Sequence, residues 1–142
     1  MNYVKYAEFW DRFIDEVYTP FIDDKTKQYS EEQKNAIIAF AYDSEVNNGG
    51  HILFFDCFGD IFSINEVTEA LWKIGGDSFA LNFVSAAAHI HYTDDLGYID
   101  KNEDADSDPE EDFIYYDMKP ALPDLLEEYI YDNKESIFLN DR

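Results

Sequence analysis

The side chains with the clearest potential for chemistry lie in an acidic stretch of the second half of the chain. Oxygen-bearing residues fall there at the first, third, fifth, ninth and twelfth places of a 12-residue segment, which is the ligand spacing of an EF-hand calcium loop. They are Asp100, Asn102, Asp104, Asp108 and Glu111. The sixth place holds Ala105, where that loop needs glycine, and the eighth holds Ser107, where an apolar anchor is usual. Calcium binding is therefore one hypothesis, and no dedicated metal site or other cofactor is predicted.

The three histidines and the single cysteine offer little for catalysis or for zinc binding. His89 and His91 are two residues apart, so on a helix they point in nearly opposite directions and cannot chelate one ion. Cys57 has no second cysteine with which to share a metal, and its bulky apolar neighbours predict a buried, inert thiol. A dyad of Cys57 with His51 or His89 stays open. We expect the protein not to be an enzyme.

Charge is the property that most restricts the function. The 142 residues include 32 acidic and 10 basic ones, which gives a formal net charge of −22. This charge disfavours direct binding to nucleic acid or to an anionic membrane, and it favours a basic protein as partner. The chain is also 46% hydrophobic and 18% aromatic, unlike a disordered acidic tail. The acids must therefore surround a well-filled core.

The acidic residues are concentrated toward the C-terminal end. Residues 93–142 carry 17 acids and 4 bases, against 15 acids and 6 bases in residues 1–92. Carboxylates three or four residues apart on a helix lie about 5–6 Å apart, and such an array can approximate the phosphates of DNA. Solubility alone is the simpler interpretation of the charge. A partner-binding acidic surface would consist of Asp94, Asp95, Asp100, Asp104, Asp106, Asp108, Glu110, Glu111 and Asp112, with Asp117, Asp124, Glu127 and Glu128 beyond.

Hydrophobic periodicity and capping residues predict helices as the scaffold for this surface. Apolar residues recur at spacings of three and four from Tyr3 to Val17, and Pro20 with the polar stretch after it should end that helix. Ser30 and Ser63 each open a further helix with a capping box. The residues expected to end helices, or to separate them, are Asn48, Gly49 and Gly50, and then Gly75 and Gly76.

The remaining segments complete an all-α prediction. Residues 51–58 are expected to form a two-turn helix, and residues 79–91 a longer one capped by Asp77 or Ser78. Residues 93–112 have no apolar period and predict a long acidic loop, after which a last helix starts near Pro123. We expect a single compact domain over residues 1–142, with about six helices and the acidic loop before the last one. Tyr115 and Tyr116, beside that loop, are candidates for an interface.

The sequence also indicates where the protein resides. One cysteine cannot form an internal disulfide, which fits a reducing cytoplasmic setting. The N-terminus lacks the apolar run of a signal peptide, and no run reaches the roughly 18–20 apolar residues of a membrane span. We therefore expect a cytoplasmic protein that does not enter membranes.

Three stretches of the sequence resemble a known family. Glu45-Val46-Asn47-Asn48-Gly49-Gly50-His51-Ile52-Leu53-Phe54-Phe55 and, downstream, Ala70-Leu71-Trp72-Lys73-Ile74-Gly75-Gly76 are similar to a bacterial family of unknown-function domains. Its best-known member is a small acidic DNA-mimic protein. Asp112-Phe113-Ile114-Tyr115-Tyr116, followed by a leucine-rich helix, is similar to that family's C-terminal pattern. The resemblance covers about residues 30–138, and His51 stands where the family usually has an aromatic or apolar residue.

The resemblance implies an all-helical domain. For the DNA-mimic member it also implies an acidic surface presented to a DNA-binding transcription regulator, which is thereby kept from its operator. The matching motifs are helix caps and core positions, so they carry the fold, whereas the acidic residues belong to no motif. The leading hypothesis is a noncatalytic decoy for the DNA-binding surface of a basic protein. An immunity-type inhibitor of a basic toxin and a calcium-responsive module are the alternatives.

Overall fold

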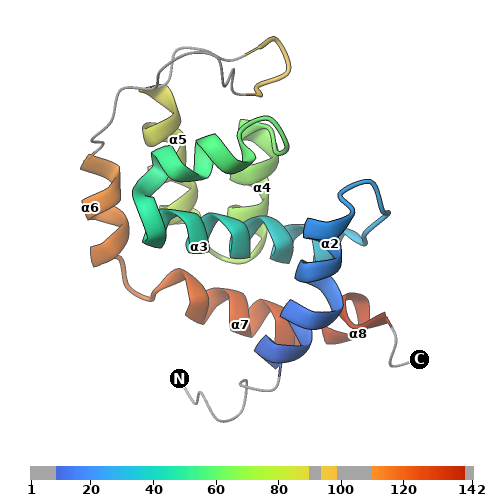
Figure 1. Ribbon diagram of the computed structural model, residues 1–142. Helices are drawn as coiled ribbons and strands as arrows, with labels where there is room; N and C mark the ends of the chain where they lie inside the picture. The colour runs from blue at the N-terminus through green and yellow to red at the C-terminus, as the bar shows by residue number, and fades with distance from the viewer. Residues whose placement is uncertain (1–8, 90–93, 99–109, 140–142) are drawn as a thin grey trace.

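The computed structural model describes residues 9–89, 94–98 and 110–139, and every regular element in these ranges is helical (Figure 1). The seven α-helices and one π-helical turn of this part confirm the predicted all-α class. No helix within the same ranges is long and apolar enough to span a membrane. The elements are η1 (Ile14–Tyr18), α2 (Thr19–Asp23), α3 (Glu31–Phe58), α4 (Ile64–Lys73), α5 (Asp77–Ala88), α6 (Glu110–Asp117), α7 (Leu122–Asp132) and α8 (Lys134–Ile137).

Helix α3 is the central element, and it bends sharply at its glycine pair (Figure 1). Gly49 (φ −160°, ψ 21°) and Gly50 (φ 78°, ψ −178°) leave the helical region, so the two predicted helices run on as one kinked element. The Gly50 conformation is open essentially only to glycine. A Cβ atom at Gly50 would also collide with the Asp112 carboxylate. The kink therefore turns His51 toward the residues of α6.

Both predicted capping boxes are present. The Ser30 hydroxyl accepts from the Gln33 N–H and the Gln33 side chain accepts from the Ser30 N–H, and Ser63 and Glu66 do the same at the start of α4. Helix α5 differs from the prediction, because Gly76 precedes it and supplies no side-chain cap. Pro123 lies in the first turn of α7, as predicted.

The N-terminal helical stretch continues past Pro20, so the prediction that the proline helps to end it was wrong. The stretch ends at Asp23, where the polar residues that were predicted to end it begin. The chain forms the π-helical turn η1 up to Tyr18, and α2 follows from Thr19 to Asp23 with Pro20 as its second residue. Proline lacks an N–H, and its ring crowds the carbonyl of the preceding turn. A widened π turn places the proline at the start of a new α-helical segment, where both problems disappear.

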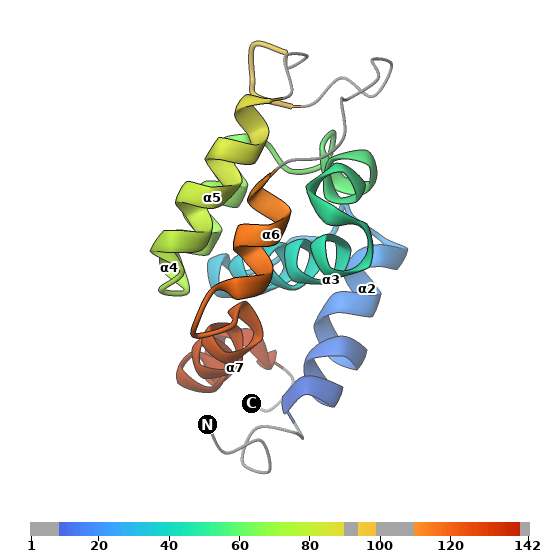
Figure 2. The ribbon, with the colours of Figure 1, turned by 90° about the vertical axis from the view of Figure 1, so that its left-hand side faces the viewer.

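One continuous cluster of buried side chains extends from Phe13 to Phe138. Tyr42 lies at its centre and makes edge-on contacts with Phe54, Phe83 and Tyr115 at centroid distances of 5.2–5.6 Å. Helix α3 contacts α4, α6, α7 and α8, so it contributes to most of the core. In Figure 2, α6 lies between α5 and α3, with α7 beyond its C-terminal end.

Cys57 is exposed, contrary to the predicted burial. Its apolar neighbours Phe54, Phe55 and Phe58 turn into the core, whereas Asp56 and Cys57 occupy the outer face of the second half of α3. The Cys57 thiol lies 3.8 Å from a Glu45 carboxylate oxygen. His51 bonds to Tyr42 and Asp112, and His89 bonds to Glu111. These contacts give no support to a Cys57 dyad with either histidine.

Candidate partner-binding surface

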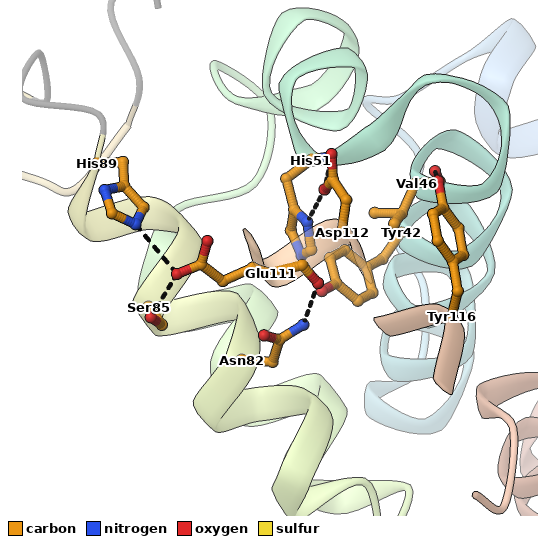
Figure 3. Close-up of polar contacts among 9 residues, drawn as sticks. All are labelled: Tyr42, Val46, His51, Asn82, Ser85, His89, Glu111, Asp112 and Tyr116. Atoms are coloured by element: carbon orange, nitrogen blue, oxygen red, sulfur yellow. Dashed lines mark hydrogen bonds and ion pairs between the residues drawn. The ribbon is translucent and has the colours of Figure 1, made fainter. Parts of the chain in front are cut away.

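Helix α6 is where the acidic stretch joins the core, and it was not predicted as a helix. Residues 110–112 belong to α6, although the sequence placed them in the acidic loop. Three acids, Glu110, Glu111 and Asp112, occupy its first turn, where the helix dipole favours negative charge. Consecutive residues of a helix point in different directions. Figure 3 shows the consequence, because Glu111 turns toward α5 and Asp112 toward α3.

Glu111 anchors α6 to α5. Its Oε1 accepts hydrogen bonds from Ser85 Oγ at 2.7 Å and from His89 Nε2 at 3.1 Å, and its backbone carbonyl accepts from Asn82 Nδ2 at 2.9 Å (Figure 3). Burial by itself would raise the pKa of Glu111, but the hydrogen bonds from Ser85 and His89 outweigh it and hold this pKa below the ordinary value. The carboxylate is 7% exposed. Glu111 therefore positions the helix and is withdrawn from the surface.

Asp112 anchors the same helix to the α3 kink. Its Oδ1 accepts from His51 Nδ1 at 2.6 Å and from the His51 backbone N–H at 2.9 Å, and His51 Nε2 lies 2.5 Å from the Tyr42 hydroxyl (Figure 3). A carboxylate only accepts, so Nδ1 carries the proton, and a neutral ring then accepts from Tyr42 through Nε2. His51 is fully buried, and desolvation lowers its pKa even though Asp112 opposes this. The chain Tyr42–His51–Asp112 thus joins both halves of α3 to α6.

Two tyrosines of α6 complete the attachment. The Tyr115 hydroxyl donates to Asp43 of α3, and the Tyr116 hydroxyl donates to the Val46 carbonyl at 2.9 Å. Burial raises the pKa of Tyr115 far above its ordinary value, and the adjacent Asp43 charge adds to this. Tyr115 is 5% exposed, so it is a core residue and not the interface residue that the sequence indicated. Tyr116 is 48% exposed.

The structure distributes the predicted acidic surface unevenly. Asp94, Asp95, Glu110, Asp117 and Glu128 are exposed, and Asp112 and Asp124 are half-buried. Glu111 and Glu127 are buried, so these two do not belong to an exposed surface. Glu127 is turned inward because its Oε1 accepts from the Trp10 indole N–H. Asp100, Asp104, Asp106 and Asp108, with Asn102 of the calcium hypothesis, lie outside the described residues.

Three carboxylates of α7 that reach solvent at least in part follow the helical repeat. Asp124, Glu128 and Asp132 are four residues apart, so they lie on one face at steps of about 6 Å along the axis. Asp132 is exposed and was missing from the predicted set, although the four-residue spacing was visible in the sequence. On α6, Glu110 and Asp117 are seven residues apart and share a face in the same way. These five carboxylates, Glu110, Asp117, Asp124, Glu128 and Asp132, are called the α6–α7 acidic surface below.

The calcium hypothesis gains no support from the part of the loop that the structure describes. Glu111 would be its bidentate twelfth ligand. Its Oε1 instead accepts from Ser85 and His89 of the neighbouring helix segment, inside a helix that starts at Glu110. Within the described ranges, no group of three His, Cys, Asp or Glu side chains is arranged to hold a metal ion.

The comparisons with known proteins bear on the chain as a whole. Comparison with curated proteins gave no match, and comparison with solved structures gave none either. The sequence does match the family described as DMP19-like protein, over residues 27–133. This match covers α3 to α7, the elements that carry the glycine motifs and the α6–α7 acidic surface, and it confirms the resemblance seen in the sequence. The chain therefore belongs to the DMP19-like protein family.

Proposed function

We propose that this protein is a noncatalytic DNA mimic that occupies the DNA-binding surface of a basic protein, such as a transcription regulator. Membership of the DMP19-like family supports the mimic character. The observation that carries the proposal is the helical spacing of carboxylates on α6 and α7, which are exposed at Glu110, Asp117, Glu128 and Asp132 and half-buried at Asp124. A row of negative charges fixed on a helix is similar to the phosphate array of a DNA backbone. It can therefore be bound by the basic surface with which a partner protein binds DNA.

The network beneath α6 supports this proposal because it makes the array rigid. Asp112, Glu111 and Tyr115 each bond α6 to a different part of the core, so the helix cannot rotate without breaking buried hydrogen bonds. Fixed charges need not be ordered on binding, and that lowers the entropic cost of association. The net charge of −22 also speeds encounter with a basic partner and keeps nucleic acid itself away.

The test uses the full chain as bait and duplex DNA as competitor. A protein that it captures should bind duplex DNA, and DNA should displace it from the bait, because the two compete for one surface. Association should also slow steeply with salt, because charge steering is screened within about 8 Å at physiological ionic strength. A captured partner that DNA does not displace would overturn the mimic proposal. An inhibited toxin would be such a partner, since DNA need not displace it.

A matched pair of variants locates the surface. Glu110→Gln, Asp117→Asn and Glu128→Gln together should weaken binding of the captured partner by about tenfold or more. The control combines Asp56→Asn, Glu69→Gln and Asp77→Asn, which removes the same number of charges from exposed positions outside α6 and α7. The control should change affinity by less than about threefold. Equal losses in both variants would mean that net charge, and not the α6–α7 acidic surface, drives binding.

A further inference from the structure

A pocket with basic walls lies away from the α6–α7 acidic surface. Its volume is about 500 Å³, and it is bounded by the α2–α3 connection, the start of α4 and Tyr98. Lys25, Lys27 and Lys34 line it, which are three of the ten basic residues of a chain that carries 32 acids. Three lysines around one pocket are unexpected in a chain with so large an excess of acidic residues. The solubility of the protein does not require these lysines.

Glu66, the acidic residue that lines this pocket, is already engaged. Glu66 pairs with Lys34 at 3.0 Å, accepts from the Ser63 N–H at 3.1 Å and accepts from the Tyr98 hydroxyl at 3.2 Å. Asp24 is turned back on its own loop, where its Oδ1 accepts from the Thr26 N–H at 3.0 Å. Lys25 and Lys27 are exposed, and neither takes part in an ion pair seen among the described residues. The Lys25 ammonium donates to the Ile22 carbonyl at 3.1 Å and lies 5.9 Å from the centre of the Phe21 ring. Because an ammonium group has three N–H donors, both lysines can still donate to an incoming anion.

The rest of the pocket is aromatic. Phe21 and Phe62 stack with centroids 5.7 Å apart and an interplanar angle of 15°, and Tyr29 meets Phe21 edge-on at 5.7 Å. Phe21 and Phe62 are nearly buried, whereas Tyr29 and Tyr98 are half-buried at the walls. Inorganic phosphate alone would fill little of this volume, because pockets of about 300–1,000 Å³ hold whole organic ligands. The half-buried Tyr29 and Tyr98 and the lysines together suit a ligand with a flat apolar part and a multiply charged group.

We propose that the pocket between α2, α3 and α4 binds a small organic phosphate that carries a flat aromatic ring, as a nucleotide does. Lys25 and Lys27 contact the phosphate, with the Lys34–Glu66 pair at the edge, and the ring lies against the aromatic wall. The overall charge of −22 does not prevent this, since repulsion from acids beyond about 8 Å is screened by physiological salt. This inference is independent of the proposed partner and of the α6–α7 acidic surface.

Isothermal titration calorimetry of the full chain tests it, with AMP as probe and with adenosine and inorganic phosphate as its two halves. AMP should bind saturably with a Kd below about 1 mM, and each half should bind at least about tenfold more weakly. Absence of saturable AMP binding would overturn the proposal. Equal binding of AMP and inorganic phosphate would also overturn it, because the ring would then contribute nothing.

Two double variants separate the pocket from net charge. Lys25→Gln with Lys27→Gln should weaken AMP binding by about tenfold or more. Lys73→Gln with Lys119→Gln removes the same charge from two exposed positions outside this pocket and should change Kd by less than about twofold. All four lysines are exposed, so circular dichroism should show unchanged helix content. An equal effect of the two double variants would show a general charge effect and would remove the pocket from consideration.

Discussion

His51 shows how a polar residue can be accommodated in an aromatic core. Its ring is fully buried, lies edge-on to Tyr42 and Tyr115, and bonds through both nitrogens to Tyr42 and Asp112. The sequence indicated only that a histidine occupies this position, where the family that the chain resembles was expected to have an aromatic or apolar residue. Its partners could not be predicted, because Asp112 lies 61 residues away and only the fold brings it close.

Removing the Tyr42 hydroxyl should destabilise the protein. Tyr42→Phe leaves His51 Nε2 buried without a donor, and such an orphaned group costs about 1–3 kcal/mol. Urea denaturation gives the free energy of unfolding that checks this. Tyr116→Phe is the control, because it also removes one hydrogen-bonded tyrosine hydroxyl, but from a residue that is 48% exposed. A loss as small as that of the control would mean that the Tyr42–His51 contact contributes little.

The same histidine should make stability depend on pH. The folded-state pKa of His51 lies below its ordinary value of 6.5, because burial disfavours the charged ring. The unfolded chain therefore takes up the proton first, so the stability from His51 is present above about pH 6.5 and decreases as pH falls below it. Tyr42 and Tyr115 lie against the His51 ring. The negative charges of Asp112 and Glu111 act on it as well, and they partly oppose the lowering of its pKa.

Urea denaturation between about pH 7.5 and 5.5 measures this dependence, with a slope of at most about 1.4 kcal/mol per pH unit from one group. In His51→Phe this contribution to the slope should be absent. In His89→Gln it should persist, because the His89 side chain is 59% exposed. Identical slopes in the parent chain and in His51→Phe would contradict the assignment.

At the scale of elements, the features that could be predicted are those set by neighbours in sequence. The capping boxes at Ser30 and Ser63 and the breaks at the glycine pairs depend on residues within one turn. Helix α6 could not be predicted, because its attachment depends on Ser85 and His51, which are 26 and 61 residues from their partners. For the same reason, the sequence could not distinguish buried Glu111 from exposed Glu110.

The kink in α3 should be sensitive to a single methyl group. Gly50→Ala places a Cβ atom against the Asp112 carboxylate in a backbone conformation that only glycine adopts easily. We expect a loss of about 1–3 kcal/mol from the backbone alone, and more from the displaced carboxylate. Gly75→Ala is the matched control, since Gly75 has a similar φ of 88° but open space around its Cβ position. Urea denaturation of both variants measures the difference, and equal losses would show that Asp112 yields without cost.

At the scale of the whole molecule, charge opposes the compact state. The net charge of −22 repels itself, and the ion pairs seen among the described residues, such as Arg12–Glu16 and Lys34–Glu66, offset little of it. A surface of this kind could be predicted from composition. Which acids reach solvent could not, because Glu111 and Glu127 are withdrawn by contacts with His89 and Trp10.

Salt should therefore stabilise the fold while it weakens partner binding. Raising NaCl from about 0.02 M to 0.5 M shortens the screening length well below 10 Å, so the melting temperature should rise by several degrees. Differential scanning calorimetry checks this. The rise should be smaller in the variant that combines Glu110→Gln, Asp117→Asn and Glu128→Gln, which has less repulsion to screen. A melting temperature that falls with salt would show that ion pairs dominate over repulsion.

The N-terminal segment has a consequence for where this protein can be divided. The family match begins at residue 27, yet Trp10, Phe13 and Tyr18 surround the Phe40 ring, and the Trp10 indole meets Glu127 of α7. The boundary of the family match thus separates side chains that pack against one another. A truncated chain that contained only the matched residues would expose the Phe40 ring to solvent. It would also leave the Glu127 carboxylate without its Trp10 donor. The segment that is shared with the family is therefore shorter than the segment that is needed for independent folding.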